Sequence, residues 1–255
     1  MDELYVLSEF KNWTFTFVIV LARTSVVVML LPGLGEIESP AILRAGLALG
    51  LTVLLTPGLG VIPTPDQAQI AIGMIVAECV VGAFLGWLAR LPVIALSVAG
   101  SLISYMVGLS SVIQYDPALG GQSSALAKLF GLAAPVLILS GGLIQLPITA
   151  LSGSYHIFPP GSVLPSDQFA TGILLAVSEC LTLGLRLATP FLISTLLMQT
   201  SLAVLARLVP QLQIYAAAIP GQILGGLALL SILISAVLLQ WQTSLHEAWQ
   251  GLPGL

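Results

Sequence analysis

Charged side chains are scarce in this sequence of 255 residues. Asp, Glu, Lys and Arg together make up 7% of it, whereas 57% of the residues are hydrophobic. A soluble domain carries about 25% charged residues, so this chain could not cover a surface that faces water. With a mean hydropathy of +1.07, the composition predicts an integral membrane protein. Because no long hydrophilic stretch is left over for a second domain, we expect one membrane domain over residues 1–255.

Other scarcities exclude classes of function. The net charge is −4 and there is no basic patch, so nucleic acid is not an expected partner. The two histidines and two cysteines lack the spacing of metal ligands, and the sequence contains no glycine-rich phosphate loop or nucleophile–base pair. We therefore expect no enzymatic activity, no cofactor and no metal. Cys79 and Cys180 both lie in apolar runs and are expected to be buried thiols rather than a disulfide.

Apolar runs follow one another along most of the chain. They are predicted at 13–31, 41–55, 67–89, 93–112, 124–146, 169–209 and 214–240. Lipid offers no partner for open backbone groups, so we predict an all-α fold of about six or seven long apolar helices. As one helix, 169–209 would be about 60 Å long, or roughly twice the hydrocarbon thickness. It is therefore either jointed near Pro190 or extends beyond the membrane. A tight turn is expected at 90–92 and a long loop at about 147–168.

One break between two apolar runs differs from the others. The segment Gly108–Gln122 carries a single charge, three glycines and an Asp116–Pro117 step. Glycines permit changes of backbone direction, so we expect a loop that can change shape around an apolar centre. Its candidate functional residues are Gly108, Ser110, Ser111, Val112, Ile113, Gln114, Tyr115, Asp116, Pro117, Gly120, Gly121 and Gln122.

Four charged residues stand inside apolar runs, namely Arg23, Glu78, Glu179 and Arg186. An unpaired charge at the bilayer centre costs at least ~2.5 kcal/mol, so each needs a partner. One interpretation is an ion or proton path, as in a secondary transporter that uses Glu78 and Glu179. The other is an internal ion pair or a contact between subunits. The second is favoured because the acids are few and isolated.

Small residues recur four positions apart in several runs and predict close helix contacts. Examples are Gly82 with Gly86, Gly46 with Gly50, and Gly221 with Gly225.

Few charged residues are available to predict the orientation of the chain in the membrane. Arg44 and Arg90 flank breaks that would share the cytoplasmic side, with the N-terminus and the segment at 108–122 opposite.

Motifs in order along nearly the whole chain resemble the FliR family of flagellar biosynthesis proteins, called SctT in virulence systems. The most specific are the Arg207–Gln213 segment and the stretch from Met106 to the Asp116–Pro117 step. Others are 22–25 with Pro32 and 39–40, 78–86, 154–162 and Pro220. At Gly221 and Gln222 the sequence departs from the family, which often has a basic residue there.

The resemblance implies a subunit of the export gate of a type III secretion apparatus, in the bacterial inner (cytoplasmic) membrane at the flagellar basal body. It implies an all-α fold like a FliP-type unit joined to a FliQ-type unit. The implied partners are FliP-, FliQ- and FlhB-type subunits, unfolded export substrates and membrane lipid. The segment matching Gly108–Gln122 would plug the pore. The residues implied as subunit contacts or buried charges are Arg23, Glu78, Glu179, Arg186, Arg207, Pro210 and Gln211. Alternatives are a virulence SctT-type subunit and the secondary transporter.

Overall fold

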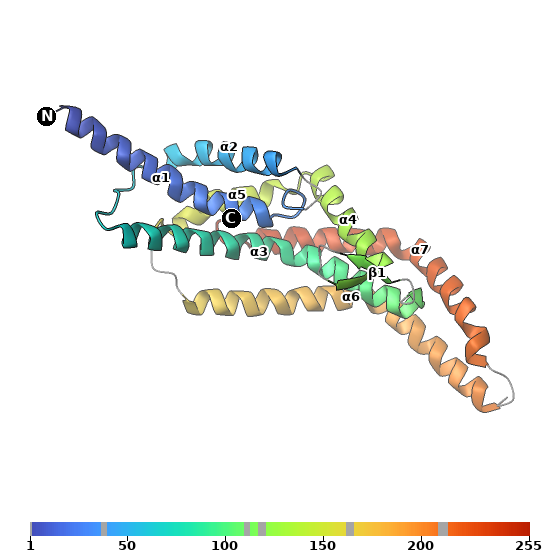
Figure 1. The fold of residues 1–255 in the computed structure, drawn as a ribbon. Helices are drawn as coiled ribbons and strands as arrows, with labels where there is room; N and C mark the ends of the chain where they lie inside the picture. The colour runs from blue at the N-terminus through green and yellow to red at the C-terminus, as the bar shows by residue number, and fades with distance from the viewer. Residues whose placement is uncertain (1, 37–39, 110–112, 117–120, 162–165, 209–213) are drawn as a thin grey trace. The chain divides into compact units, whose positions relative to one another are not determined.

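The structure is a computed structural model that describes residues 2–36, 40–109, 113–116, 121–161, 166–208 and 214–255 (Figure 1). Within these residues the chain is helical apart from one short sheet, which confirms the predicted all-α fold. The helices are α1 (Asp2–Leu30), α2 (Ala41–Leu59), α3 (Ala68–Val107), α4 (Ala125–Ser140), α5 (Gln145–Ile157), α6 (Ser166–Leu208) and α7 (Ile214–Gln250). Five are long and apolar enough to cross a membrane, or six if α4 and α5, which meet at 75°, form one span.

Helix α3 is continuous through Pro92, so the turn predicted at 90–92 is wrong. Proline removes one backbone donor, and two buried tryptophans of α7 bind carbonyls in this stretch of α3. The indole N–H of Trp241 donates to the carbonyl of Pro92 at 2.8 Å, and that of Trp249 donates to Ala89 at 3.0 Å. Arg90 lies within a helix rather than at a turn. The membrane orientation predicted from Arg44 and Arg90 is therefore no longer supported.

The loop predicted at 147–168 is also wrong in its first part, because Gln145–Ile157 forms α5. Pro147 lies in the first turn of this helix, where a missing N–H leaves no helical bond unmade. Gly153 lets the helix approach the backbone of Gly254 closely. Farther along, α6 is a single helix of 43 residues that passes through Pro190. The run is therefore one continuous helix, and its extension beyond a membrane stays a prediction.

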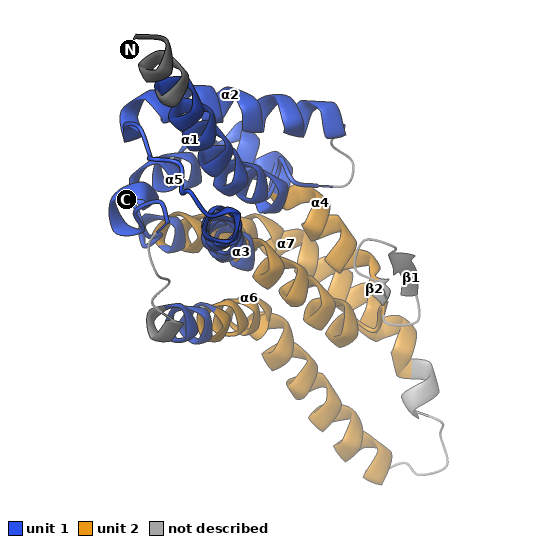
Figure 2. Cartoon of the chain, turned by 60° about the vertical axis from the view of Figure 1, so that its left-hand side comes forward, with its two compact units in different colours: residues 1–91, 135–176, 248–255 blue, residues 92–134, 177–247 orange. Residues whose placement is uncertain are grey.

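The chain divides into two compact units, which Figure 2 colours separately. The first comprises residues 1–91, 135–176 and 248–255, and the second comprises 92–134 and 177–247. Helices α3, α4, α6 and α7 contribute residues to both. The single domain expected from the sequence stays a prediction.

In the first unit, α1 and α2 pack side by side (Figure 1) and are joined by a bond of 2.8 Å between the buried hydroxyls of Thr24 and Thr52. α3 lies against α1 at Gly82, where an added Cβ would come within 2.7 Å of the carbonyl oxygen of Arg23. An apolar core forms around these helices and α5; its buried members are Val27, Leu31, Val81, Leu85, Leu151 and Phe158.

In the second unit, small residues again set the spacing between helices. A Cβ at Gly100 of α3 would lie 2.8 Å from the Cα of Ala127 on α4, and one at Gly184 of α6 would lie 3.1 Å from the carbonyl oxygen of Ala95. A side chain at Gly100 would therefore force its neighbours to shift, and one at Gly184 would be tight. Tight glycine contacts are therefore confirmed for these helices and for the pair Gly82 and Gly86.

Candidate functional site

The segment expected to be a mobile loop contains an antiparallel β-hairpin. Strand β1 (Ile113–Asp116) pairs with β2 (Gly121–Ser124), with Ile113 opposite Ser124 and Asp116 opposite Gly121. Eight residues of the expected loop thus form paired strands, and its ability to change shape stays a prediction. The β-branched and aromatic residues Ile113 and Tyr115 favour a strand at this position. Gly121, one of the glycines of this segment, lies in a paired strand.

Not every residue of the predicted plug is open to description. Ser110, Ser111, Val112, Pro117 and Gly120 lie outside the described residues. For Ile113, Gln114, Tyr115, Asp116, Gly121 and Gln122 the structure describes the backbone alone. Gly108 is fully described. It has a φ of +88°, a conformation that favours glycine; its expected role as a hinge stays a prediction.

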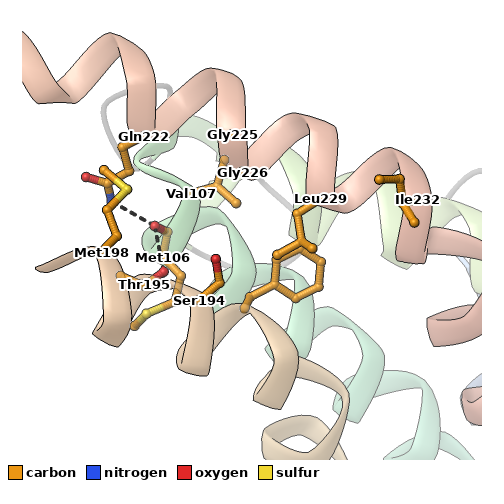
Figure 3. A pocket seen from close by; sticks show the side chains of 11 residues that line it. Met106, Val107, Ser194, Thr195, Met198, Gln222, Gly225, Gly226, Leu229 and Ile232 are labelled. Atoms are coloured by element: carbon orange, nitrogen blue, oxygen red, sulfur yellow. Dashed lines mark hydrogen bonds between the residues drawn. The ribbon is translucent and has the colours of Figure 1, made fainter. Parts of the chain in front are cut away.

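The segment 108–124, which contains the hairpin, begins at the end of α3, and this base is held by side chains because the helix carbonyls there have no further backbone donors. The carbonyl of Met106 accepts a hydrogen bond from Nε2 of Gln222 at 2.8 Å and one from Oγ1 of Thr195 at 3.3 Å. Figure 3 shows both side chains reaching Met106, from α7 and α6 respectively. At the other base, Oγ of Ser124 accepts the N–H of Ala127 at 3.2 Å and so caps the start of α4.

A cavity of about 270 Å³ lies beside this base, between the end of α3, α6 and α7 (Figure 3). Its wall is mostly apolar, with Met106, Met198 and Phe191 among its residues, and it also contains the polar groups of Ser194, Thr195 and Gln222.

A buried ion pair forms a second cluster, within the first unit. Nε of Arg23 on α1 donates to Oε2 of Glu78 on α3 at 2.7 Å, and the two side chains are 0% and 2% exposed. The other guanidinium nitrogens donate to Oγ of Ser154 at 3.1 Å and to the carbonyl of Phe158 at 2.8 Å. Glu78 uses its remaining oxygen to accept the N–H of Gly161 at 3.2 Å. Both charges are thus satisfied by fixed partners.

The ring of Tyr155 lies against this pair, with the guanidinium carbon of Arg23 at 4.1 Å from the ring centroid. Its hydroxyl is buried and has no hydrogen-bond partner among the described residues. The cluster as a whole joins α1, α3 and α5 together with the chain that follows α5. Of the open interpretations of Arg23 and Glu78, an internal ion pair is confirmed.

The remaining predicted charges are arranged differently. Glu179, Arg186 and Arg207 are all exposed on α6, while Pro210 and Gln211 lie outside the described residues. No three His, Cys, Asp or Glu side chains among the described residues come close enough to hold a metal ion.

Several residues of these clusters could not be chosen from the sequence. The pattern gives no sign that Ser154 and the carbonyl of Phe158 face an arginine more than 130 positions earlier. Gln222 carried one signal, because it stands where the resembled family often has a basic residue. Met106 begins one of the most specific motifs of the resemblance, but nothing marked its carbonyl, and Thr195 carried no signal, since it is an ordinary member of an apolar helix.

Comparison with known proteins places these features in context. Residues 14–248 match the family described as "Bacterial export proteins, family 1". The chain is 29% identical to the flagellar biosynthetic protein FliR of Caulobacter vibrioides, over 90% of this chain and 92% of that protein. It is 27% identical to FliR of Escherichia coli over 92% and 90%. It is 26% identical to the Yop proteins translocation protein T of Yersinia pestis over 80% of each.

Proposed function

This chain belongs to family 1 of the bacterial export proteins, and from that premise we propose that it is a subunit of the export gate of a flagellar type III secretion apparatus. Family membership confirms the resemblance expected from the sequence motifs. The flagellar assignment follows the FliR proteins of Caulobacter vibrioides and Escherichia coli, which are 29% and 27% identical to this chain; a virulence subunit like the Yop protein, at 26%, is the alternative. The protein crosses a membrane several times, which we infer to be the inner membrane.

The observation that carries a role in a larger assembly is the amount of apolar helix surface left uncovered. Each of α1, α2 and α7 has an apolar stretch of 18 residues. Of this stretch, 44% is buried in α1, but only 17% in α2 and 11% in α7. A Cβ added at Gly46, Gly50, Gly221 or Gly225 would meet nothing within 4 Å. In contrast, one added at Gly82 or Gly86 would collide with a neighbouring helix. We infer that α2 and α7 pack against helices of FliP- and FliQ-type subunits, with lipid covering the rest.

Helix α6 offers a further subunit contact. Six exposed residues follow a 4–3 spacing that places them on one face; they are Leu175, Glu179, Thr182, Arg186, Thr189 and Ile193. A charge facing lipid at the bilayer centre costs about 2.5–3.5 kcal/mol. A partner helix with groups complementary to Glu179 and Arg186 removes this cost. We therefore infer that this face meets another subunit, and we extend the same role to Arg207.

The hairpin between α3 and α4 is inferred to be the plug of the pore. Its sequence supplies apolar bulk at Val112, Ile113 and Tyr115 and almost no charge. Such a segment blocks ions without binding them strongly. The pore itself would be shared with FliP-, FliQ- and FlhB-type subunits and would pass unfolded export substrates, while other subunits supply the energy.

Affinity purification of the tagged chain from detergent tests the assignment. Co-purification of FliP- and FliQ-type proteins in fixed proportion is the expected result. A chain that purifies alone and still transports a small solute in vesicles would instead be a secondary transporter. That alternative needs Glu78 to exchange protons, whereas its carboxylate is held by Arg23 and Gly161.

A further inference from the structure

We propose that the outer face of α5 lines a water-filled passage and contacts the unfolded chain of an export substrate there. This inference rests on the proposed export function and adds to it a surface along which the substrate moves. Helix α5 lies wholly within the first unit (Figure 2).

Helix α5 has one polar face, opposite its buried side. Four exposed residues recur at a 4–3–4 spacing; they are Gln145, Thr149, Ser152 and His156. At about 100° per residue, this spacing places them within an arc of about 60° on one side of the helix. The other side contains the buried residues, which are Pro147, Ala150, Leu151, Ser154 and Tyr155. The outer face is thus polar along the whole helix, and it carries no Asp, Glu, Lys or Arg.

This face differs from the exposed faces of other helices in the same unit. The exposed side chains of α2 include Ile42, Leu43, Val53 and Leu54. On α5, Thr149 and Ser152 bond to carbonyls of their own helix. The side chains of Gln145 and His156 have no hydrogen bond to any residue that the structure describes. An amide and an imidazole therefore need partners from beyond this part of the chain.

The surroundings of α5 argue against lipid as that partner. Ser154 is bonded to Arg23 of α1 at 3.1 Å, and Leu151 shares an apolar core with Val81 of α3. Arg23 and Val81 both lie inside helices long and apolar enough to cross a membrane, at 9–30 and 68–107. Lipid at that depth is hydrocarbon, which offers neither donor nor acceptor. The polar face is therefore matched by water or by polar groups of another chain.

Water and an unfolded chain match this face better than a packed helix of another subunit does. The cores of protein interfaces are enriched in aromatic residues and methionine and are poor in serine, whereas this face has neither aromatic residues nor methionine. An unfolded polypeptide exposes a donor and an acceptor at nearly every residue, and hydroxyl, amide and imidazole groups can bind these in turn. Because the face carries no full charge, it holds neither acidic nor basic segments strongly, as the passage of many different sequences requires.

The buried side of α5 fixes this surface in place. Ser154 is held by the guanidinium of Arg23, and Gly153 lies against the backbone of Gly254. Leu151 is 2% exposed within the apolar core. The helix therefore presents its polar face as a rigid wall, past which a substrate moves without disturbing the packing of the subunit.

Water accessibility of single cysteines in the assembled gate tests the inference. Cys79→Ala and Cys180→Ala remove the native thiols. Ser152→Cys and Thr149→Cys then place a thiol on the polar face, so that a second variant is available if one assembles poorly. Val53→Cys is the matched control, since Val53 is 59% exposed on the apolar face of α2.

The gates are purified with their partner subunits, placed in lipid nanodiscs and treated with a charged methanethiosulfonate. A second measurement repeats the labelling with an export substrate fused to a stably folded domain, which stalls the unfolded part of that substrate inside the gate. We expect both α5 variants to react at least about tenfold faster than the α2 control, because a thiol must ionise to react and hydrocarbon disfavours the ion. The stalled substrate should slow the labelling of α5 and leave the control unchanged.

Slow labelling of both α5 variants, in gates that contain the partner subunits, would overturn the inference and leave the proposed function intact. Fast labelling that the stalled substrate does not change would also overturn it, because the face would then be wet without contacting substrate. A chain that purifies without partner subunits would refute the proposed function and the inference with it.

Discussion

Nε of Arg23 lies 2.7 Å from Oε2 of Glu78, with both side chains shielded from solvent. The two residues are 55 positions apart and join α1 to α3. Ser154, Phe158 and Gly161 satisfy the remaining donors and acceptor of the pair. This buried pair therefore joins α1 to α3 within the first unit.

Breaking this pair from one side should be costly. Glu78→Gln leaves a buried guanidinium without its counter-charge, and we expect a loss of about 3–5 kcal/mol in stability. Thermal unfolding in detergent measures it. The control is Glu36→Gln, because the pair of Glu36 with Arg90 is 3.3 Å long and about a quarter to a third exposed; there we expect a loss of less than about 1 kcal/mol. Equal losses in the two variants would mean that burial of the Arg23 pair contributes nothing.

Tyr155 allows the ring and the hydroxyl to be tested separately. The hydroxyl is buried without a partner among the described residues, so Tyr155→Phe should leave stability unchanged or raise it by about 1 kcal/mol. Tyr155→Leu removes the ring over Arg23 and should cost about 0.5–2 kcal/mol for that contact, besides lost packing. The same unfolding assay compares the two. A phenylalanine variant as unstable as the leucine variant would show that the hydroxyl has a partner after all.

Glycines on different helices should respond differently to the same change. Gly82→Ala places a Cβ 2.7 Å from the carbonyl oxygen of Arg23 and should lower the thermal midpoint of the isolated subunit. Gly46→Ala meets nothing within 4 Å and should leave the isolated subunit as stable as before, or slightly more so because alanine favours helix. We expect Gly46→Ala instead to reduce co-purification of partner subunits. Normal assembly of this variant would show that α2 does not use this face for packing.

The exposed charges of α6 distinguish a protein partner from lipid. Glu179→Leu and Arg186→Leu remove charges from an apolar helix, so in contact with lipid each should favour insertion by about 3 kcal/mol. If a partner helix carries complementary groups, the same changes leave those groups buried and unpaired, and the yield of assembled gate should fall. Co-purification from detergent measures the yield. An unchanged or improved yield would contradict the proposed contact.

The sequence predicted the helical class well because long apolar runs have one physical solution in a membrane. It did worse where a local signal was overridden by distant contacts. Pro92 is a strong turn signal, yet Trp241 supplies a donor to its carbonyl from about 150 positions away. The loop expected at 147–168 contains α5, since its proline occupies a tolerated position in the first turn.

The candidate sites followed the same pattern. Arg23 and Glu78 could be identified as residues in need of partners, but nothing in the sequence showed that they pair with each other. The segment at 108–122 was identified by its glycines and lack of charge, whereas the hairpin within it depends on pairing such as Asp116 with Gly121. The hydrogen bond of Gln222 depends on the position of the Met106 carbonyl, which the sequence does not reveal.

Ion conductance of purified gates reconstituted in lipid vesicles tests the central claim most directly. The comparison is between gates with the complete chain and gates whose chain lacks residues 110–120, with co-purification confirming that both assemble. We expect the complete gate to be sealed and the deleted gate to conduct small ions. A deleted gate that assembles fully and remains as tight as the complete one would contradict the assignment of the hairpin as the plug.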